Sequence, residues 1–279
     1  MTNELPPPID DATAQRVFDA TGFHGADLIA LEGYPDAAHP DEVVFLSGSY
    51  VTGQANPWSD VDLFVVGTRG PATDRHMDAT TNQVVPHFVD GKRIDWEYWQ
   101  PEVIDDLATR LAAHELGTGR SIQGASFLLI ELILVHRIRI GWPLQNAEGF
   151  AALQGKFDWG HFAAFLTEEA IRHLDAEVED LIGMRKGGDR TSALWVARQV
   201  VDVNVEAYLH SLGGTDPVAK WRVRNLEALD PSPRHDRLKA EYARLMYPDL
   251  AFLLEGDNWH GYVEEVLEFS NRVSAWAQG

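Results

Sequence analysis

The hydrophobic positions in the first hundred residues follow the pattern of β-strands. The run VVFLSGSY, residues 43–50, is apolar until it breaks at Gly48, which predicts a strand that ends in a tight turn. A second apolar run, VDLFVVG, covers residues 61–67. In KRIDWEYWQ, residues 92–100, hydrophobic and polar residues alternate, which predicts a strand with one polar face. The first hundred residues are therefore predicted to form a small sheet.

After residue 100 the hydrophobic positions recur at helical spacing, and Gly, Pro, Ser or Asp residues separate the segments. The predicted helices cover residues 101–114, 121–140, 161–184, 191–212, 235–247 and 261–277. One more helix is predicted over ATAQRVFDATGF, residues 12–23, after three consecutive prolines. We therefore expect an α+β protein of two packed domains, residues 1–100 and 101–279, of which the second is a helical bundle.

Composition narrows the classes of partner. The net charge of -20 disfavours a polynucleotide, because such a field repels phosphate backbones. It suits a cationic small molecule, or serves solubility alone. The absence of cysteine excludes disulfides, thiolate nucleophiles and thiolate metal sites. The N-terminal residues lack the pattern of a signal peptide, and no stretch approaches the about 20 apolar residues of a membrane span, so a soluble cytoplasmic protein is expected.

Two carboxylates mark the start of the second predicted strand. Asp60 and Asp62 are two residues apart, so both side chains point to the same face of the sheet. Like charges this close call for a counterion, and carboxylate oxygens are the ligands that Mg²⁺ prefers. Asp95 lies on the polar face of the third predicted strand and would complete a site for two Mg²⁺ ions if that strand lies alongside. Glu97, on the same strand face, is the alternative third ligand.

A Gly-Ser pair precedes these acids. Gly48 lets backbone N–H groups approach a phosphate closely, and Ser49 adds a hydroxyl donor. Ser49 and Asp60 are eleven residues apart, which is enough for the chain to return to the sheet beside the acids. Trp58, just before the acids, and Trp221, beside Lys220, are candidates for stacking on a base or on an acceptor ring.

The stretch FLSGSYVTGQANPWSDVDLFVVG followed by RIDWEYW resembles the DNA polymerase beta superfamily of nucleotidyltransferases. The resemblance implies a small mixed-sheet catalytic domain followed by a helical domain that closes over nucleotide and acceptor. It also implies that Gly48 and Ser49 bind the nucleotide phosphates. Asp60 and Asp62 would ligate both metal ions, and Asp95 would be the third ligand and a candidate general base.

The size and two-part layout are similar to those of enzymes that transfer one nucleotide to an antibiotic. We therefore expect a Mg²⁺-dependent enzyme that moves a nucleoside monophosphate from a nucleoside triphosphate, such as ATP, to a hydroxyl of a small molecule, for example an aminoglycoside-like antibiotic or natural product. Two alternatives stand beside it: a toxin-like nucleotidyltransferase acting on a protein or tRNA, and a non-catalytic nucleotide-binding module. The nucleotide base, the acceptor and the oligomeric state stay open.

Overall fold

A computed structural model describes residues 18, 22, 41–67, 83–89, 91–117 and 127–279. These residues fall into two compact units. The sheet unit lies within residues 2–114 and 121–159, and the helical unit lies within residues 115–120 and 160–279. The predicted domain boundary at residue 100 stays a prediction. By their contacts, residues 101–114 and 121–159, which follow it, group with the sheet.

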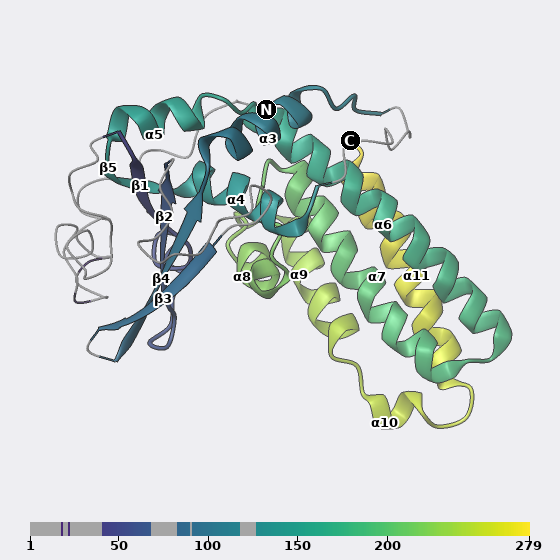
Figure 1. Ribbon diagram of the computed structural model, residues 1–279. Coiled ribbons are helices and arrows are strands. Elements are labelled where there is room, and N and C mark those ends of the chain that lie inside the picture. Colours follow the sequence, from purple (N-terminus) through teal and green to yellow (C-terminus); the bar gives the residue numbers. More distant parts are fainter. Residues whose placement is uncertain (1–17, 19–21, 23–40, 68–82, 90, 118–126) are drawn as a thin grey trace. The chain divides into compact units, whose positions relative to one another are not determined.

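The sheet unit is built on a mixed sheet of five strands (Figure 1), which confirms the predicted α+β class. The spatial order of the strands is β3-β4-β2-β1-β5. Strands β2 and β4 are parallel, whereas the other neighbours are antiparallel. The strands are β1 (Val43–Ser47), β2 (Val61–Val66), β3 (Gln83–Val89), β4 (Lys92–Trp99) and β5 (Trp142–Gln145).

Alternation along the strands decides which side chains enter the core. Val61, Leu63 and Val65 of β2 are fully buried in one hydrophobic cluster with residues of β1 and β4. The opposite face of the sheet carries Asp62 and Phe64. Here the ring of Phe45 stacks on Phe64 with centroids 5.0 Å apart. The helices of this unit are α3 (Pro101–Ala112), α4 (Leu129–Ile140) and α5 (Ala147–Gln154).

The two outer strands, β3 and β5, were not predicted. Each contains a proline, Pro86 in β3 and Pro143 in β5, and both residues read as interruptions in the sequence. An edge strand tolerates proline because one of its sides makes no ladder hydrogen bonds. Both strands are edges of this sheet, which explains why they form and why the pattern hid them. The helix predicted over residues 12–23 lies outside the described residues, apart from Phe18 and Gly22.

The helical unit has its own hydrophobic core. Helices α7 and α11 lie side by side (Figure 1) and bury Val200, Val201, Val263 and Val266 between them. Asp189 caps α7 by accepting from the backbone N–H of Ser192. No helix in the described ranges could cross a membrane. The helices are α6 (Trp159–Gly187), α7 (Arg190–Ser211), η1 (Ala219–Trp221), α8 (Arg222–Glu227), α9 (Pro233–Met246), α10 (Leu250–Leu253) and α11 (Asn258–Ala277).

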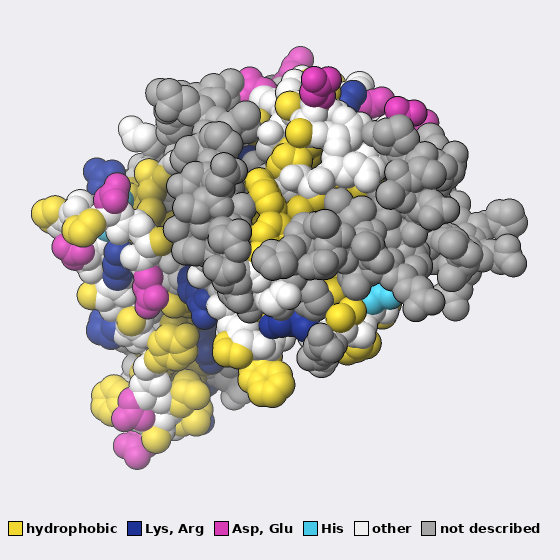
Figure 2. Space-filling view, turned by 90° about the vertical axis from the view of Figure 1, so that its left-hand side faces the viewer, with side chains coloured by type: hydrophobic (Ala, Val, Ile, Leu, Met, Phe, Trp, Pro, Cys, Tyr) yellow, Lys and Arg dark blue, Asp and Glu magenta, His cyan; other side chains and the backbone are white. Residues whose placement is uncertain are grey.

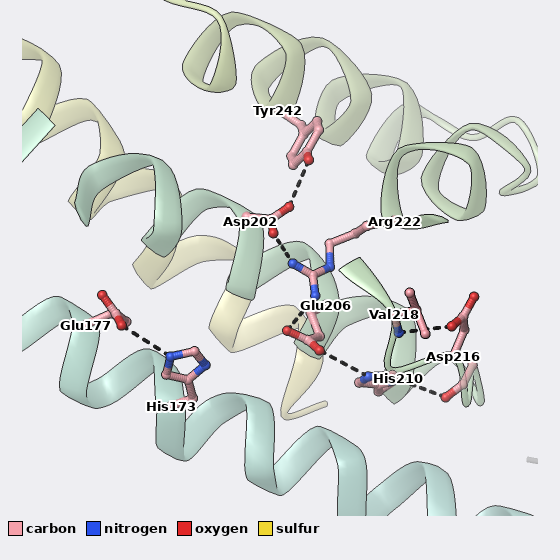
Figure 3. A network of polar contacts seen from close by, with 10 residues as sticks. His173, Glu177, Asp202, Glu206, His210, Asp216, Val218, Arg222 and Tyr242 are labelled. Carbon is pink, nitrogen blue, oxygen red and sulfur yellow. Dashed lines mark hydrogen bonds and ion pairs between the residues drawn. The ribbon is translucent and has the colours of Figure 1, made fainter. Parts of the chain in front are cut away.

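A network of polar side chains crosses this unit from α7 to α8 and α9 (Figure 3). The buried guanidinium of Arg222 binds Asp202 and also binds Glu206, with 2.7 Å between Nη2 and Oε2 of Glu206. The hydroxyl of Tyr242 donates to Asp202 over 2.9 Å. Burial works against ionisation of Glu206, but the hydrogen bond with His210 and the charge of Arg222 outweigh it and lower the pKa of Glu206. The network therefore holds Glu206 in its charged form.

Candidate active site

Three carboxylates converge at the start of β2. Strand β2 pairs with β4 so that Asp62 lies opposite Asp95, and Asp60 immediately precedes β2. Paired residues of adjacent strands point to the same face, so the register brings Asp62 and Asp95 together, and Asp60 joins them from two residues before Asp62. One carboxylate oxygen from each of the three residues lies within 4.8 Å of the others. The donor set and its spacing fit a divalent cation, which carboxylate oxygens bind.

Asp62 is the most strongly perturbed of these groups. Burial raises the pKa of Asp62 to about 6, and the charges of Asp60, Glu97 and Asp95 add to the increase. The guanidinium of Arg137 acts in the opposite direction. The charge of Arg137 therefore offsets only part of the effect of burial and of the neighbouring carboxylates on the pKa of Asp62.

Asp95 and Glu97 differ in their partners. Nε of Arg93 donates to Oδ1 of Asp95 over 2.7 Å, and this hydrogen bond raises the pKa of Arg93. The carboxylate of Glu97 accepts from the indole N–H of Trp99 over 2.8 Å. Glu97 lies opposite Phe64, two positions beyond Asp95 in the register and on the same face. Asp95 thus completes the close cluster with Asp60 and Asp62. Glu97 affects this cluster through its charge, which raises the pKa of Asp62.

The backbone of Gly48 lies close to Asp62. It follows the last residue of β1 and has a φ of +87°, which L side chains rarely adopt. A Cβ atom at this position would overlap with Oδ2 of Asp62 and would lie 2.8 Å from Nη1 of Arg137. Ser49 is buried, and its carbonyl oxygen accepts from the backbone N–H groups of Gln54 and Ala55. The turn after β1 is therefore folded tightly against Asp62.

Arg137 was missed by the sequence prediction. It lies in the last turn of α4, with 3.5 Å between its Nη2 and Oδ2 of Asp62. The signal available in the sequence was a basic pair, Arg137 and Arg139, at the end of a helix, and basic residues are common there because they offset the helix dipole. Only the packing of α4 beside β1 reveals that Arg137 contacts the acids.

The two tryptophans differ in exposure. Trp58 is 95% exposed on a turn fixed by reciprocal hydrogen bonds between Asn56 and Ser59, directly before Asp60. In the helical unit, Trp221 already has cationic neighbours, with Nζ of Lys220 at 4.9 Å and Cζ of Arg224 at 5.5 Å from its ring centroid. Trp58 therefore offers an exposed ring two residues before Asp60, whereas the ring of Trp221 belongs to the helical unit and contacts two cations.

This region is similar to a known family of protein domains. Residues 35–123, which include the three carboxylates and the turn at Gly48, match the family model of the nucleotidyltransferase domain. The chain carries a nucleotidyltransferase domain. It is therefore a transferase that handles nucleotides, as the sequence predicts.

One solved structure similar to the chain is a nucleotidyltransferase-like protein from Exiguobacterium sibiricum 255-15, with 12% sequence identity and a TM-score of 0.46. That similarity covers 93% of this chain and 77% of the other. No curated protein matches the chain.

Proposed function

We propose that the nucleotidyltransferase domain transfers a nucleoside monophosphate from a nucleoside triphosphate to a hydroxyl group of a small molecule, with Mg²⁺ held by Asp60, Asp62 and Asp95. The observation that carries the proposal is the convergence of three carboxylates within 4.8 Å in a nucleotidyltransferase domain. Two Mg²⁺ ions, when bound, would neutralise charge on the phosphates and align the attacking and leaving oxygens.

The side chains and backbone of this chain supply the remaining parts. The backbone of Gly48 and the hydroxyl of Ser49 bind the phosphates, because the turn after β1 lies directly beside Asp62. Asp95 accepts the proton of the acceptor hydroxyl, or Mg²⁺, when bound, would lower the pKa of that hydroxyl enough to make a dedicated base unnecessary. The exposed ring of Trp58 is available to stack on the base or the acceptor.

The acceptor we propose is a cationic small molecule, such as an aminoglycoside-like antibiotic or natural product, recognised by the helices that follow residue 100. The support is the net charge of -20, which attracts cations and repels nucleic acid. On the face drawn in Figure 2, Lys and Arg side chains lie beside hydrophobic ones, with Asp and Glu side chains among them.

Pyrophosphate release tests the proposal. Each nucleoside triphosphate is incubated with Mg²⁺ and a panel of aminoglycosides and other polyols, and release is compared between the wild type and the double variant Asp60→Asn/Asp62→Asn. We expect release with at least one acceptor and a loss of at least about 100-fold in the double variant, because Asn carries no charge to hold the ions.

A matched control is Asp236→Asn, which removes an exposed carboxylate of α9 and should leave the rate unchanged. Release that persists in the double variant would overturn the metal assignment. If the wild type binds the nucleotide but releases no pyrophosphate with any acceptor, the transfer reaction itself is wrong and a binding module is favoured.

A further inference from the structure

Arg137 lies where the turn at Gly48 meets Asp62. Its Nη2 is 3.5 Å from Oδ2 of Asp62, and its Nη1 is 2.8 Å from the position that a Cβ of Gly48 would take. The side chain is 14% exposed, so it is largely buried but reaches the surface. The guanidinium therefore faces the carboxylate that we propose as a metal ligand and the turn that we propose as the phosphate cradle.

The backbone of Arg137 is fixed to the same turn. The hydroxyl of Ser47, the last residue of β1, donates to the carbonyl oxygen of Arg137 over 3.0 Å. Ser47 directly precedes Gly48 and lies opposite Asp62 in the register of β1 and β2. Ser47 therefore holds the backbone of Arg137, and Asp62 holds its guanidinium. These two contacts fix the position of the guanidinium.

The donors of this guanidinium are not all used. Among the described residues, Nε of Arg137 is buried and has no hydrogen-bond partner. A buried donor without a partner costs about 1–3 kcal/mol, so such a group calls for an explanation. A guanidinium presents a planar fork of donors that matches the oxygens of a phosphate group. A phosphate seated on the backbone of Gly48 would lie within reach of this fork.

We propose that Arg137 is a substrate-binding residue that contacts the triphosphate over Gly48 while it holds Asp62 in position. This inference rests on the proposed function, because it assumes that a nucleoside triphosphate occupies the turn. It adds a residue from outside the motif: a cation supplied by α4, which is tied to β1 on one side of β2, whereas Asp95 lies on β4 on the other side. Arg137 and a divalent cation would then share the charge of Asp62.

If Arg137 and Mg²⁺ share the charge of Asp62, loss of the arginine should change the affinities for Mg²⁺ and for a triphosphate in opposite directions. Two cations beside the same carboxylate repel each other, so removing the charge of Arg137 should not weaken the binding of Mg²⁺ alone and should favour it. The same change removes charge-assisted hydrogen bonds to phosphate and should weaken the binding of a triphosphate. A residue that only packs α4 against the sheet would instead affect both ligands in the same direction.

Calorimetry with the full chain separates these cases. The probes are Mg²⁺ alone, inorganic tripolyphosphate with Mg²⁺, and ATP, GTP, CTP and UTP with Mg²⁺, measured at pH 8.5. For Arg137→Gln we expect affinity for tripolyphosphate and for the bound nucleotide to fall at least about tenfold. Affinity for Mg²⁺ alone should be unchanged or higher. The matched control is Arg139→Gln, which removes the same charge about 200° further around α4 and should bind every probe as the wild type does.

The outcomes distinguish this inference from the proposed function. Unchanged tripolyphosphate affinity in Arg137→Gln, or a parallel loss for Mg²⁺ and tripolyphosphate, overturns the role of Arg137 and leaves the proposed function standing. A wild type that binds no nucleotide overturns both. If circular dichroism shows that Arg137→Gln does not fold, Arg137→Lys is the deciding variant. It should keep its affinity for Mg²⁺ but lose affinity for tripolyphosphate, because lysine lacks the forked donors of the guanidinium. Wild-type affinity for both probes would contradict the proposal.

Discussion

At the scale of single residues, Gly48 carries two separate constraints. Its φ of +87° strains any other residue, and a Cβ atom would overlap with Oδ2 of Asp62. We predict that Gly48→Ala lowers the free energy of unfolding by about 2 kcal/mol or more, since strain at positive φ alone costs about 1 kcal/mol and the displaced carboxylate adds to it. Urea denaturation measures this loss, and calorimetry should show weaker Mg²⁺ binding.

Gly53 offers a control within the same loop. Its φ of +70° is also positive, but a Cβ atom there would meet nothing within 4 Å. Gly53→Ala therefore carries the strain without the overlap and should leave Mg²⁺ binding intact. Equal losses of stability and of Mg²⁺ affinity in the two variants would show that Gly48 does not act through Asp62.

The raised pKa of Asp62 makes the binding of a cation depend on pH. The pKa of about 6 exceeds the ordinary 3.8, so the folded protein retains this proton where the unfolded chain has lost it. Without Mg²⁺, the stability that Asp62 contributes is present below about pH 4 and is lost as the pH rises through about 6. Because Mg²⁺ binds the carboxylate form, we predict that Mg²⁺ raises the melting temperature more at pH 8 than at pH 5.

Thermal melts with and without Mg²⁺ at several pH values between 5 and 8 check this prediction. The matched variant is Asp62→Asn, which cannot titrate and should lose the change centred near pH 6. A Mg²⁺-induced shift that is the same at pH 5 and pH 8 in the wild type would contradict it.

At the scale of elements, local pattern decided what could be predicted. β1, β2 and β4 are central strands of the sheet and have clear apolar or alternating runs, so their positions could be predicted. The face of each carboxylate followed from the alternation of side chains along a strand. The convergence of Asp60, Asp62 and Asp95 needed only one assumption, that β2 and β4 are neighbours. β3 and β5 were not predicted because each contains a proline, which in a sequence indicates the end of a strand although an edge strand tolerates it.

Helix α4 shows what the pattern does not contain. Its periodicity predicted a helix, but its partners depend on contacts between distant segments. At its start, Glu131 accepts from the backbone N–H of Leu128 over 2.7 Å and from Nη2 of Arg110 in α3 over 2.6 Å. Near its end, Ser47 of β1 binds the carbonyl of Arg137. The contacts of Glu131 with Arg110 and of Arg137 with Ser47 join segments that are far apart in the sequence. They place Arg137 beside Asp62, and no spacing within the sequence encodes them.

At the scale of the whole molecule, the sheet unit and the helical unit bury separate hydrophobic clusters. The network around Arg222 belongs entirely to the helical unit (Figure 3), and the three carboxylates belong to the sheet unit. Damage to the network should therefore reduce the stability of the helical unit while the carboxylates keep their affinity for Mg²⁺. This separation allows the stability of one unit to be varied without altering the proposed metal ligands.

We predict that Arg222→Ala lowers the free energy of unfolding of the helical unit by about 3–5 kcal/mol, because it leaves Asp202 and Glu206 partly buried without their cation. Urea denaturation followed by circular dichroism measures the loss, and calorimetry at a temperature where the variant is folded should give wild-type Mg²⁺ affinity. Arg237→Ala is the control, since Arg237 pairs with Glu241 on the surface of α9 with 54% of its side chain exposed and should cost at most about 0.5 kcal/mol. Equal costs for the two variants would mean that burial does not set the strength of the network.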